Sequence, residues 1–133
     1  LPVDGGWRAR GEKAHMERKN EPFAHDADLA WEPAGEGVTR KILTYRDEVM
    51  MVRVHFEAGA IGPSHSHPHI QCSLVESGVF DITIAGHTER LVAGDSFTVP
   101  PDAIHGAVNI EAGVLVDVFT PMRRDFLPAM SAG

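Results

Sequence analysis

The stretch SHSHPHIQ, from Ser64 to Gln71, carries three of the chain's eight histidines at alternate positions. In an extended strand, residues two apart point to the same face and lie about 6–7 Å apart along the chain. The side chains of His65, His67 and His69 can therefore converge on one point in front of the strand, and Gln71 shares their parity. Convergent imidazoles are typical of a divalent metal site. The pattern predicts such a site, and spacing alone does not exclude His69 from it.

Short strands separated by turns must position these residues. The strand-like runs are VTRKILTY, VMMVRVHFEA, QCSLVES, VFDITIA, TERLV, SFTVP, AVNI and VLVDVFT. We expect turns between them at Ser77-Gly78, Ala85-Gly86, Ala93-Gly94-Asp95, Pro100-Pro101-Asp102 and Ala112-Gly113. No convincing amphipathic helix lies between the runs, so the pattern indicates an all-β sandwich or barrel.

The two ends of the chain have a different character. Residues 1–37 are rich in glycine, proline and mixed charge, which predicts an N-terminal arm with at most a short helix around Glu12 to Lys19. Residues 38–127 form the expected single domain, and residues 128–133 form a short C-terminal tail. A length of 133 residues suits one domain with a modest core.

The composition limits the classes of molecule that the protein is expected to bind. Twelve Lys and Arg against 19 Asp and Glu give a net charge of −7, which argues against nucleic-acid binding. A small anionic substrate would need a locally positive pocket. The single Cys72 excludes an internal disulfide and suits a reducing compartment. No apolar run approaches the roughly 20 residues of a membrane span, and no signal-peptide pattern opens the sequence, so we expect a cytoplasmic protein.

Two spaced blocks carry a resemblance to a known family. The first runs through Gly59, His65, His67, Gln71 and Gly78, and the second through Gly94, Pro100, His105 and Asn109. In order and spacing they resemble the two signature motifs of the cupin superfamily. Gln71 stands where that superfamily usually has glutamate, and Asp102 stands where it has glycine.

The resemblance implies a single-domain cupin jelly-roll barrel that holds one divalent metal ion. The implied ligands are His65, His67, Gln71 and His105, with His69 at the cavity edge. Three neutral imidazoles and a neutral amide would leave the full double charge on the ion, which favours Lewis-acid work over oxygenase chemistry. Zn, Ni, Fe and Mn all suit this ligand set.

A narrower resemblance covers about Trp31 to Leu127. The stretches GVTRKILTYRDEVMMVRVHFEAGAIGPSHSHPHIQ and HGAVNIEAGVLVDVFTPMRRDFL are similar to the small KdgF-type cupins of pectin and alginate degradation, whose pattern includes the glutamine ligand. Their functional D-x-F-x-P-x-R stretch matches Asp117 to Arg123. The resemblance implies that Asp117 is the acid/base residue and Arg123 the clamp on a substrate carboxylate. A structural ion pair between the two is the alternative.

Two further residues are candidates for substrate binding. Arg53 shares a strand face with Met51 and His55, and it binds an anionic sugar if that face is the inner one. Phe119 shares parity with Asp117 and forms either an apolar wall under the sugar ring or ordinary core. His15, His25, His55 and His87 belong to no constellation, and we assign them no function.

The predicted activity is therefore a non-redox isomerisation. The resemblance implies that 4,5-unsaturated uronate monosaccharides are opened to linear 4-deoxy-5-keto sugar acids. The alternatives are an Fe(II)-dependent cupin dioxygenase and a non-catalytic module that binds sugar acids. By analogy with small cupins we expect a homodimer.

Overall fold

The strands predicted from alternating hydrophobicity are present in the computed structural model of the protein, which describes residues 15–127. The described strands are β1 (Glu32–Gly35), β2 (Val38–Arg46), β3 (Val49–Phe56), β4 (Ile61–His65), β5 (Ile70–Ile84), β6 (His87–Val92), β7 (Ser96–Val99) and β8 (His105–Thr120). Of these, β1 and β4 were not among the predicted runs. Within the described range the helical elements are 3-10 turns: η1 (His15–Arg18), η2 (Asp26–Asp28) and η3 (Arg124–Phe126). The predicted all-β class is confirmed.

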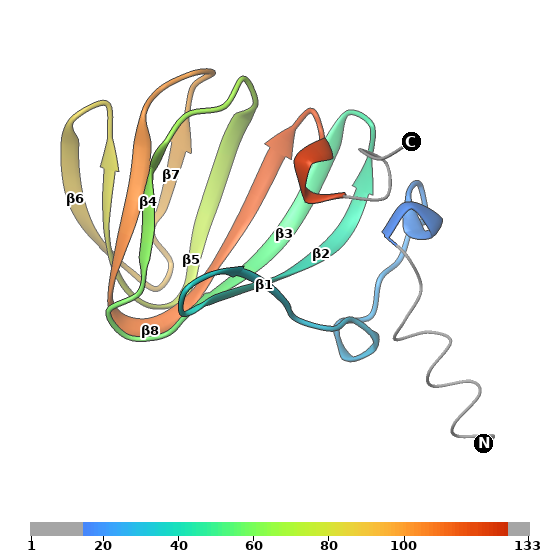
Figure 1. Cartoon of the computed structure of the whole chain (residues 1–133), viewed down its shortest axis with the longest axis horizontal. Helices are drawn as coiled ribbons and strands as arrows, with labels where there is room; N and C mark the ends of the chain where they lie inside the picture. The colour runs from blue at the N-terminus through green and yellow to red at the C-terminus, as the bar shows by residue number, and fades with distance from the viewer. Residues whose placement is uncertain (1–14, 128–133) are drawn as a thin grey trace.

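All strand pairs are antiparallel. They form the order β1-β2-β3-β8-β5-β6, while β4 also pairs with β8 and β7 with β5. Figure 1 shows β8 descending beside β4, crossing the base of the molecule and rising beside β3. One strand therefore belongs to both walls of the barrel. In residues 15–127, no helix is long and apolar enough to cross a membrane.

The long strands β5 and β8 correct two of the predicted turns. Ser77-Gly78 lies inside β5 and Ala112-Gly113 inside β8, where the register between the two strands shifts. Gly78 has φ +85°, and a Cβ there would lie 2.6 Å from the Glu111 carbonyl oxygen. A Cβ on Gly113 would collide with the backbone of Ser77. These glycines permit two backbones to approach closely, which is the other common role of glycine in a strand.

Two hydrophobic clusters flank the interior. One lies around β2, β3 and the C-terminal segment and contains Ile42, Tyr45, Met50, Val52, Phe119, Met122 and Leu127. The other lies near the bend of β5 and β8 and contains Val38, Phe56, Val75, Phe80, Ile82 and Leu115. Val54 packs against both clusters. Both clusters contain residues of β3 and β8. They therefore fix the positions of the inward side chains of these two strands.

The predicted N-terminal arm is partly built into the sheet. β1 pairs with β2, so residues 32–35 add a strand to this chain's own barrel. Upstream, the Arg18 guanidinium donates to the carbonyl oxygens of Ile42 and Leu43, next to the register shift in β2. The weak helix prediction around Glu12 corresponds to η1 in the described range. Residues 1–14 and the predicted tail at 128–133 lie outside it.

Candidate metal centre and active-site cavity

Three of the predicted metal ligands come together. His65 ends β4 and His105 begins β8, and the two residues face each other across the β4–β8 pair. His67 follows in the connection to β5. One ring nitrogen from each of the three histidines lies within 4.8 Å of the others. The His65 and His105 ring centroids are 4.3 Å apart, and those of His67 and His105 are 4.7 Å apart.

Backbone carbonyls orient two of the imidazoles. Nδ1 of His65 is 2.9 Å from the Pro63 oxygen, and Nδ1 of His105 is 2.9 Å from the Ala103 oxygen. Each Nδ1 therefore carries the proton as donor, and each Nε2 keeps a free lone pair. Nε2 of His105 is buried and has no hydrogen-bond partner. That orphaned acceptor is what a metal ion would satisfy, so these residues fit the predicted cation.

Burial favours the ligand form of the inner histidines. Desolvation lowers the pKa of both His67 and His105, and the positive charge of Arg123 lowers the pKa of His67 further. A neutral imidazole is the form that binds a metal. The site therefore needs little energy for deprotonation before it accepts a cation.

Gln71 joins the histidines to the predicted acid/base residue. Its Oε1 is 3.1 Å from Nε2 of His67, and its Nε2 donates to the Ser73 hydroxyl oxygen at 3.0 Å. Ser73 in turn donates to Oδ1 of Asp117 at 2.6 Å. All four side chains are buried. A continuous chain of hydrogen bonds thus runs from the histidine cluster on to Asp117.

Ser73 is a site residue that the sequence analysis missed. It lies two residues after Gln71 on β5, where buried and exposed positions alternate strictly from Ile70 to Glu76. A serine at an inward position of an apolar strand was the available signal, because a buried hydroxyl requires a partner.

Asp117 is a buried carboxyl group at an inward position of β8. Its neighbours along β8, Val116 and Val118, face outward, while Asp117 faces the interior opposite Val52. Burial raises the pKa of Asp117 to about 6, although the Ser73 hydrogen bond and the charge of Arg123 both act to lower it. A carboxyl group that titrates near neutral pH can both accept and return a proton.

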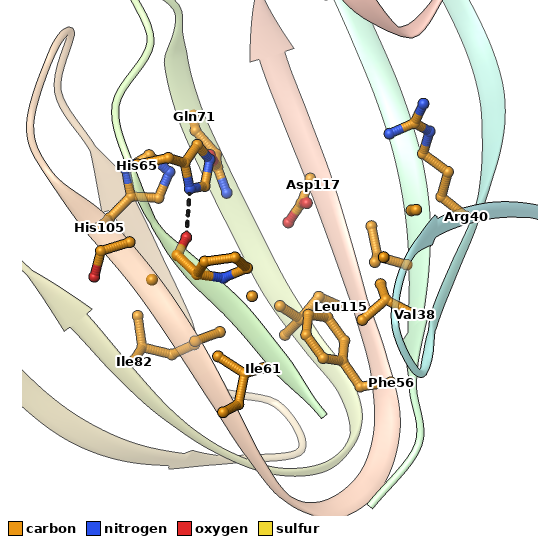
Figure 2. A pocket seen from close by; sticks show the side chains of 18 of the residues that line it. Val38, Arg40, Phe56, Ile61, His65, Gln71, Ile82, His105, Leu115 and Asp117 are labelled. Atoms are coloured by element: carbon orange, nitrogen blue, oxygen red, sulfur yellow. Dashed lines mark hydrogen bonds between the residues drawn. The ribbon is translucent and has the colours of Figure 1, made fainter. Parts of the chain in front are cut away.

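His65, Gln71, His105 and Asp117 line one cavity of about 580 Å³. Figure 2 shows His65 and His105 on one side, Asp117 in the middle and Arg40 on the far side. Most of the remaining wall is apolar, with contributions from Val38, Val54, Phe56, Ile61, Ile82, Leu115 and Phe119. A volume of this order fits one small organic molecule.

Arg123 and Phe119 also line this cavity. Nε and Nη2 of Arg123 hold the Asp125 carboxylate at 3.0 and 2.7 Å, so its ion pair is with Asp125 and not with Asp117. The guanidinium lies 4.8 Å from the Phe119 ring centroid and 4.3 Å from that of Phe126. The structure thus brings Phe119 and Arg123 to the same cavity as Asp117, as the sequence analysis expected.

Arg53 is the predicted site residue that the structure places elsewhere. Its guanidinium pairs with Asp26 at 2.9 Å and Glu76 at 3.3 Å on the outer side of the sheet. The face it shares with Met51 and His55 is the outer one, because Met50, Val52 and Phe56 are the buried members of β3. Arg53 is therefore corrected to a surface ion-pairing residue.

The remaining histidines differ in their surroundings. The His69 ring lies 5.3 Å from that of His67, and its Nδ1 is buried without a partner, which places it beside the cluster. Within the described range, His65, His67 and His105 form the one group with metal-ligand spacing. His55 packs against Trp31, and His15 and His87 contact Glu32 and Glu89.

Comparisons with known proteins agree with this architecture. Residues 52–119 match the model of a cupin domain. The pectin degradation protein KdgF of Dickeya dadantii (strain 3937) is 44% identical over 104 residues, which cover 77% of this chain and 94% of that protein.

Two solved structures are similar over most of the chain. An RmlC-like cupin from Shewanella frigidimarina NCIMB 400 is 40% identical with a TM-score of 0.79, covering 82% of this chain and 98% of that one. KdgF from a Halomonas species is 36% identical with a TM-score of 0.76, covering 79% and 97%.

Proposed function

Since this chain belongs to the cupin family and is similar over most of its length to pectin degradation protein KdgF, we propose that it acts in the breakdown of pectin or alginate. The specific reaction is the opening of 4,5-unsaturated uronate monosaccharides to linear 4-deoxy-5-keto uronates. The observation that carries this proposal is the buried carboxyl group of Asp117, which lines one cavity with Arg123 and with His65 and His105, two members of the three-histidine cluster.

A divalent cation would be held by His65, His67 and His105, with the Gln71 amide oxygen beside them. When bound, it would supply positive charge that stabilises an oxygen on which negative charge develops. The residues that would hold it are uncharged, so the protein would not weaken that charge. Zn, Ni, Fe and Mn remain equally suitable.

Asp117 exchanges the protons in this scheme. The carboxylate takes the proton of the anomeric hydroxyl while the C1–O5 bond breaks, which leaves an aldehyde at C1 and an enolate at C5. Return of a proton to C4, from Asp117 or a water molecule, produces the C5 ketone. Atoms and electrons balance without an oxidant or reductant. A pKa of about 6 allows Asp117 both roles near neutral pH.

Arg123 and Phe119 orient the substrate. The guanidinium of Arg123 attracts the uronate carboxylate, while the Phe119 ring offers an apolar surface to the sugar. The cavity lining carries Arg40 and Arg123 against Glu36 and Asp117, so a bound divalent cation would supply the positive balance that an anionic substrate needs in a chain of net charge −7.

The test is loss of alkene absorbance in the isolated unsaturated galacturonate monosaccharide. We expect purified protein with measured metal content to accelerate this loss above the buffer rate, and chelation to remove the acceleration. Oxygen uptake in the same cell distinguishes a dioxygenase. A decay no faster than buffer in metal-loaded protein would refute the proposal, and tight sugar-acid binding without turnover would favour a binding module.

Two predictions about the protein's setting are untested. A cytoplasmic location follows from the single cysteine, which is a free thiol in the structure. A homodimer follows from the resemblance to small cupins, and light scattering on the purified protein measures it directly.

A further inference from the structure

A second arginine lies on the inner face of the barrel. Arg40 is in β2 between Val38 and Ile42, which are both buried, so the alternation of the strand turns all three toward the interior. The side chain of Arg40 lines the same cavity as Asp117 and Arg123. Figure 2 shows it across Asp117 from His65 and His105.

The charge of Arg40 is poorly satisfied. Its Nε is buried without a hydrogen-bond partner, and its Nη2 lies 3.9 Å from Glu32 Oε2, which is beyond hydrogen-bonding distance. The guanidinium lies 3.8 Å from the centroid of the Phe126 ring. Within residues 15–127 it makes no direct hydrogen bond, in contrast to Arg123, whose fork is occupied by Asp125.

We propose that Arg40 is a second substrate-binding arginine, which together with Arg123 receives the carboxylate of a sugar acid at the end of the cavity remote from the histidines. This assignment rests on the proposed function and deepens it. A buried donor without an acceptor costs stability, and a bound carboxylate supplies the acceptor. Because Nε and Nη2 of Arg123 are engaged by Asp125, a carboxylate needs donors from a second residue.

The two arginines, Arg40 and Arg123, also orient the substrate. With its carboxylate between the two guanidinium groups, the sugar ring extends toward Asp117 and the histidines. Both arginines stack on Phe126, at 3.8 and 4.3 Å from the ring centroid, so one aromatic side chain fixes the spacing of the two cations. The acid, the cation site and the carboxylate site then stand in one line.

The assignment is tested by calorimetric titration of the metal-loaded protein. The ligands are galacturonate and, as the neutral probe, galactose. We expect Arg40→Gln to weaken galacturonate binding by about tenfold to a hundredfold and to leave galactose binding unchanged. Arg40→Lys should recover part of the loss, because it restores the charge without the fork. Arg46→Gln, at an exposed position of the same strand, is the matched control.

Kinetics separates this inference from the proposed function. With the unsaturated uronate, Arg40→Gln should raise KM by a similar factor and change kcat much less. Unchanged galacturonate affinity in Arg40→Gln, or no preference of the wild type for galacturonate over galactose, would overturn the assignment. If Arg40→Gln does not fold, Arg40→Lys decides: several-fold weaker binding supports the assignment and wild-type affinity refutes it. Arg40-dependent binding without alkene loss would refute only the reaction.

Discussion

The two ends of the cavity are built by different means. At the histidine end, two of the imidazoles are each oriented by a carbonyl oxygen only two residues away, Pro63 for His65 and Ala103 for His105. At the arginine end, Arg40 comes from β2, while Arg123 and Phe126 come from the segment after β8. The histidine end is therefore held by nearby backbone groups. The arginine end is held by packing between segments that are distant in the sequence.

The two ends therefore suit ligands of opposite charge. The histidine end presents neutral imidazole nitrogens, which suit a cation. The arginine end presents guanidinium groups stacked on an aromatic ring, which suit an anion. Asp117 lies between the two ends, and the hydrogen bond that its carboxylate accepts from Ser73 connects it to the histidine end. Substitutions at the two ends should therefore affect metal content and substrate affinity separately.

The largest effect is expected at the group shared by both ends. Asp117→Asn removes the proton acceptor and should lower the rate of alkene loss by about 10²–10⁴-fold. Metal content should not change, because the histidines are intact. Asp81→Asn, which alters the ion pair with Arg90, is the control and should retain full activity. A normal rate in Asp117→Asn would clear Asp117 of its assigned role.

At the histidine end, His105→Ala should reduce metal content and activity together. Removal of a ligand should weaken the affinity for the cation by more than the roughly 10–100-fold known for groups that only orient ligands. Elemental analysis of dialysed protein measures the loss, and the exposed His87→Ala serves as control. Full metal content in His105→Ala would mean that the cation lies elsewhere.

At the arginine end, Phe126→Ala removes the ring on which both guanidinium groups stack. Each stacking contact contributes about 0.5–2 kcal/mol, so KM for the uronate should rise by roughly tenfold while metal content stays constant. Steady-state kinetics with Phe23→Ala, an exposed aromatic position, provides the comparison. Loss of metal in Phe126→Ala would break the separation of the two ends.

Ser73→Ala should shift the pH dependence. The Ser73 hydroxyl stabilises the ionised form of Asp117, so its removal should raise the pKa of Asp117 above about 6. Because the carboxylate is the required base, the acidic limb of kcat/KM should move to higher pH, by about one unit at most. A profile from pH 5 to 9 with Ser96→Ala as control measures it. A shift to lower pH would contradict the direction of this hydrogen bond.

The smallest effect is expected at Arg53. Since its partners Asp26 and Glu76 lie on the outer side of the sheet, Arg53→Gln should change kcat/KM by less than about twofold and stability by less than about 1 kcal/mol. Comparison with Arg40→Gln sharpens the distinction between an inward and an outward arginine. A KM for Arg53→Gln as high as that of Arg40→Gln would invalidate it.

Much of the fold could be predicted because alternation within a strand is a local property. The runs around β2, β3 and β7 were recognised from it. The turns predicted at Ser77-Gly78 and Ala112-Gly113 were wrong because a glycine signals either a reversal or a close approach of two backbones. Only the pairing of β5 with β8 distinguishes these two uses, and that pairing is not a local property.

The residues of the candidate site also fall into two groups, those that the sequence predicts and those that only the packed structure reveals. His65, His67, Gln71 and His105 stood out because their spacing resembles the cupin motifs, and Asp117 stood out as a carboxylate in an apolar run. Arg40 in β2 and Arg53 in β3 are both arginines among apolar strand residues, and only the packed sheet reveals which one faces the cavity. Ser73 carried only the signal of a serine at an inward strand position, and its hydrogen bond to Asp117 depends on the pairing of β5 with β8.

The bend of β8 has a consequence for how such an enzyme can change over evolution. One uninterrupted strand carries His105 near its start and Asp117 near its end, and it folds over where Gly113 contacts β5. The spacing between His105 and Asp117 is thus set by the main chain of β8, so insertions in the hairpins that join the other strands leave it unchanged. Substitutions and insertions in the loops can change the entrance of the cavity and its ligand preference, while the spacing between His105 and Asp117 stays constant.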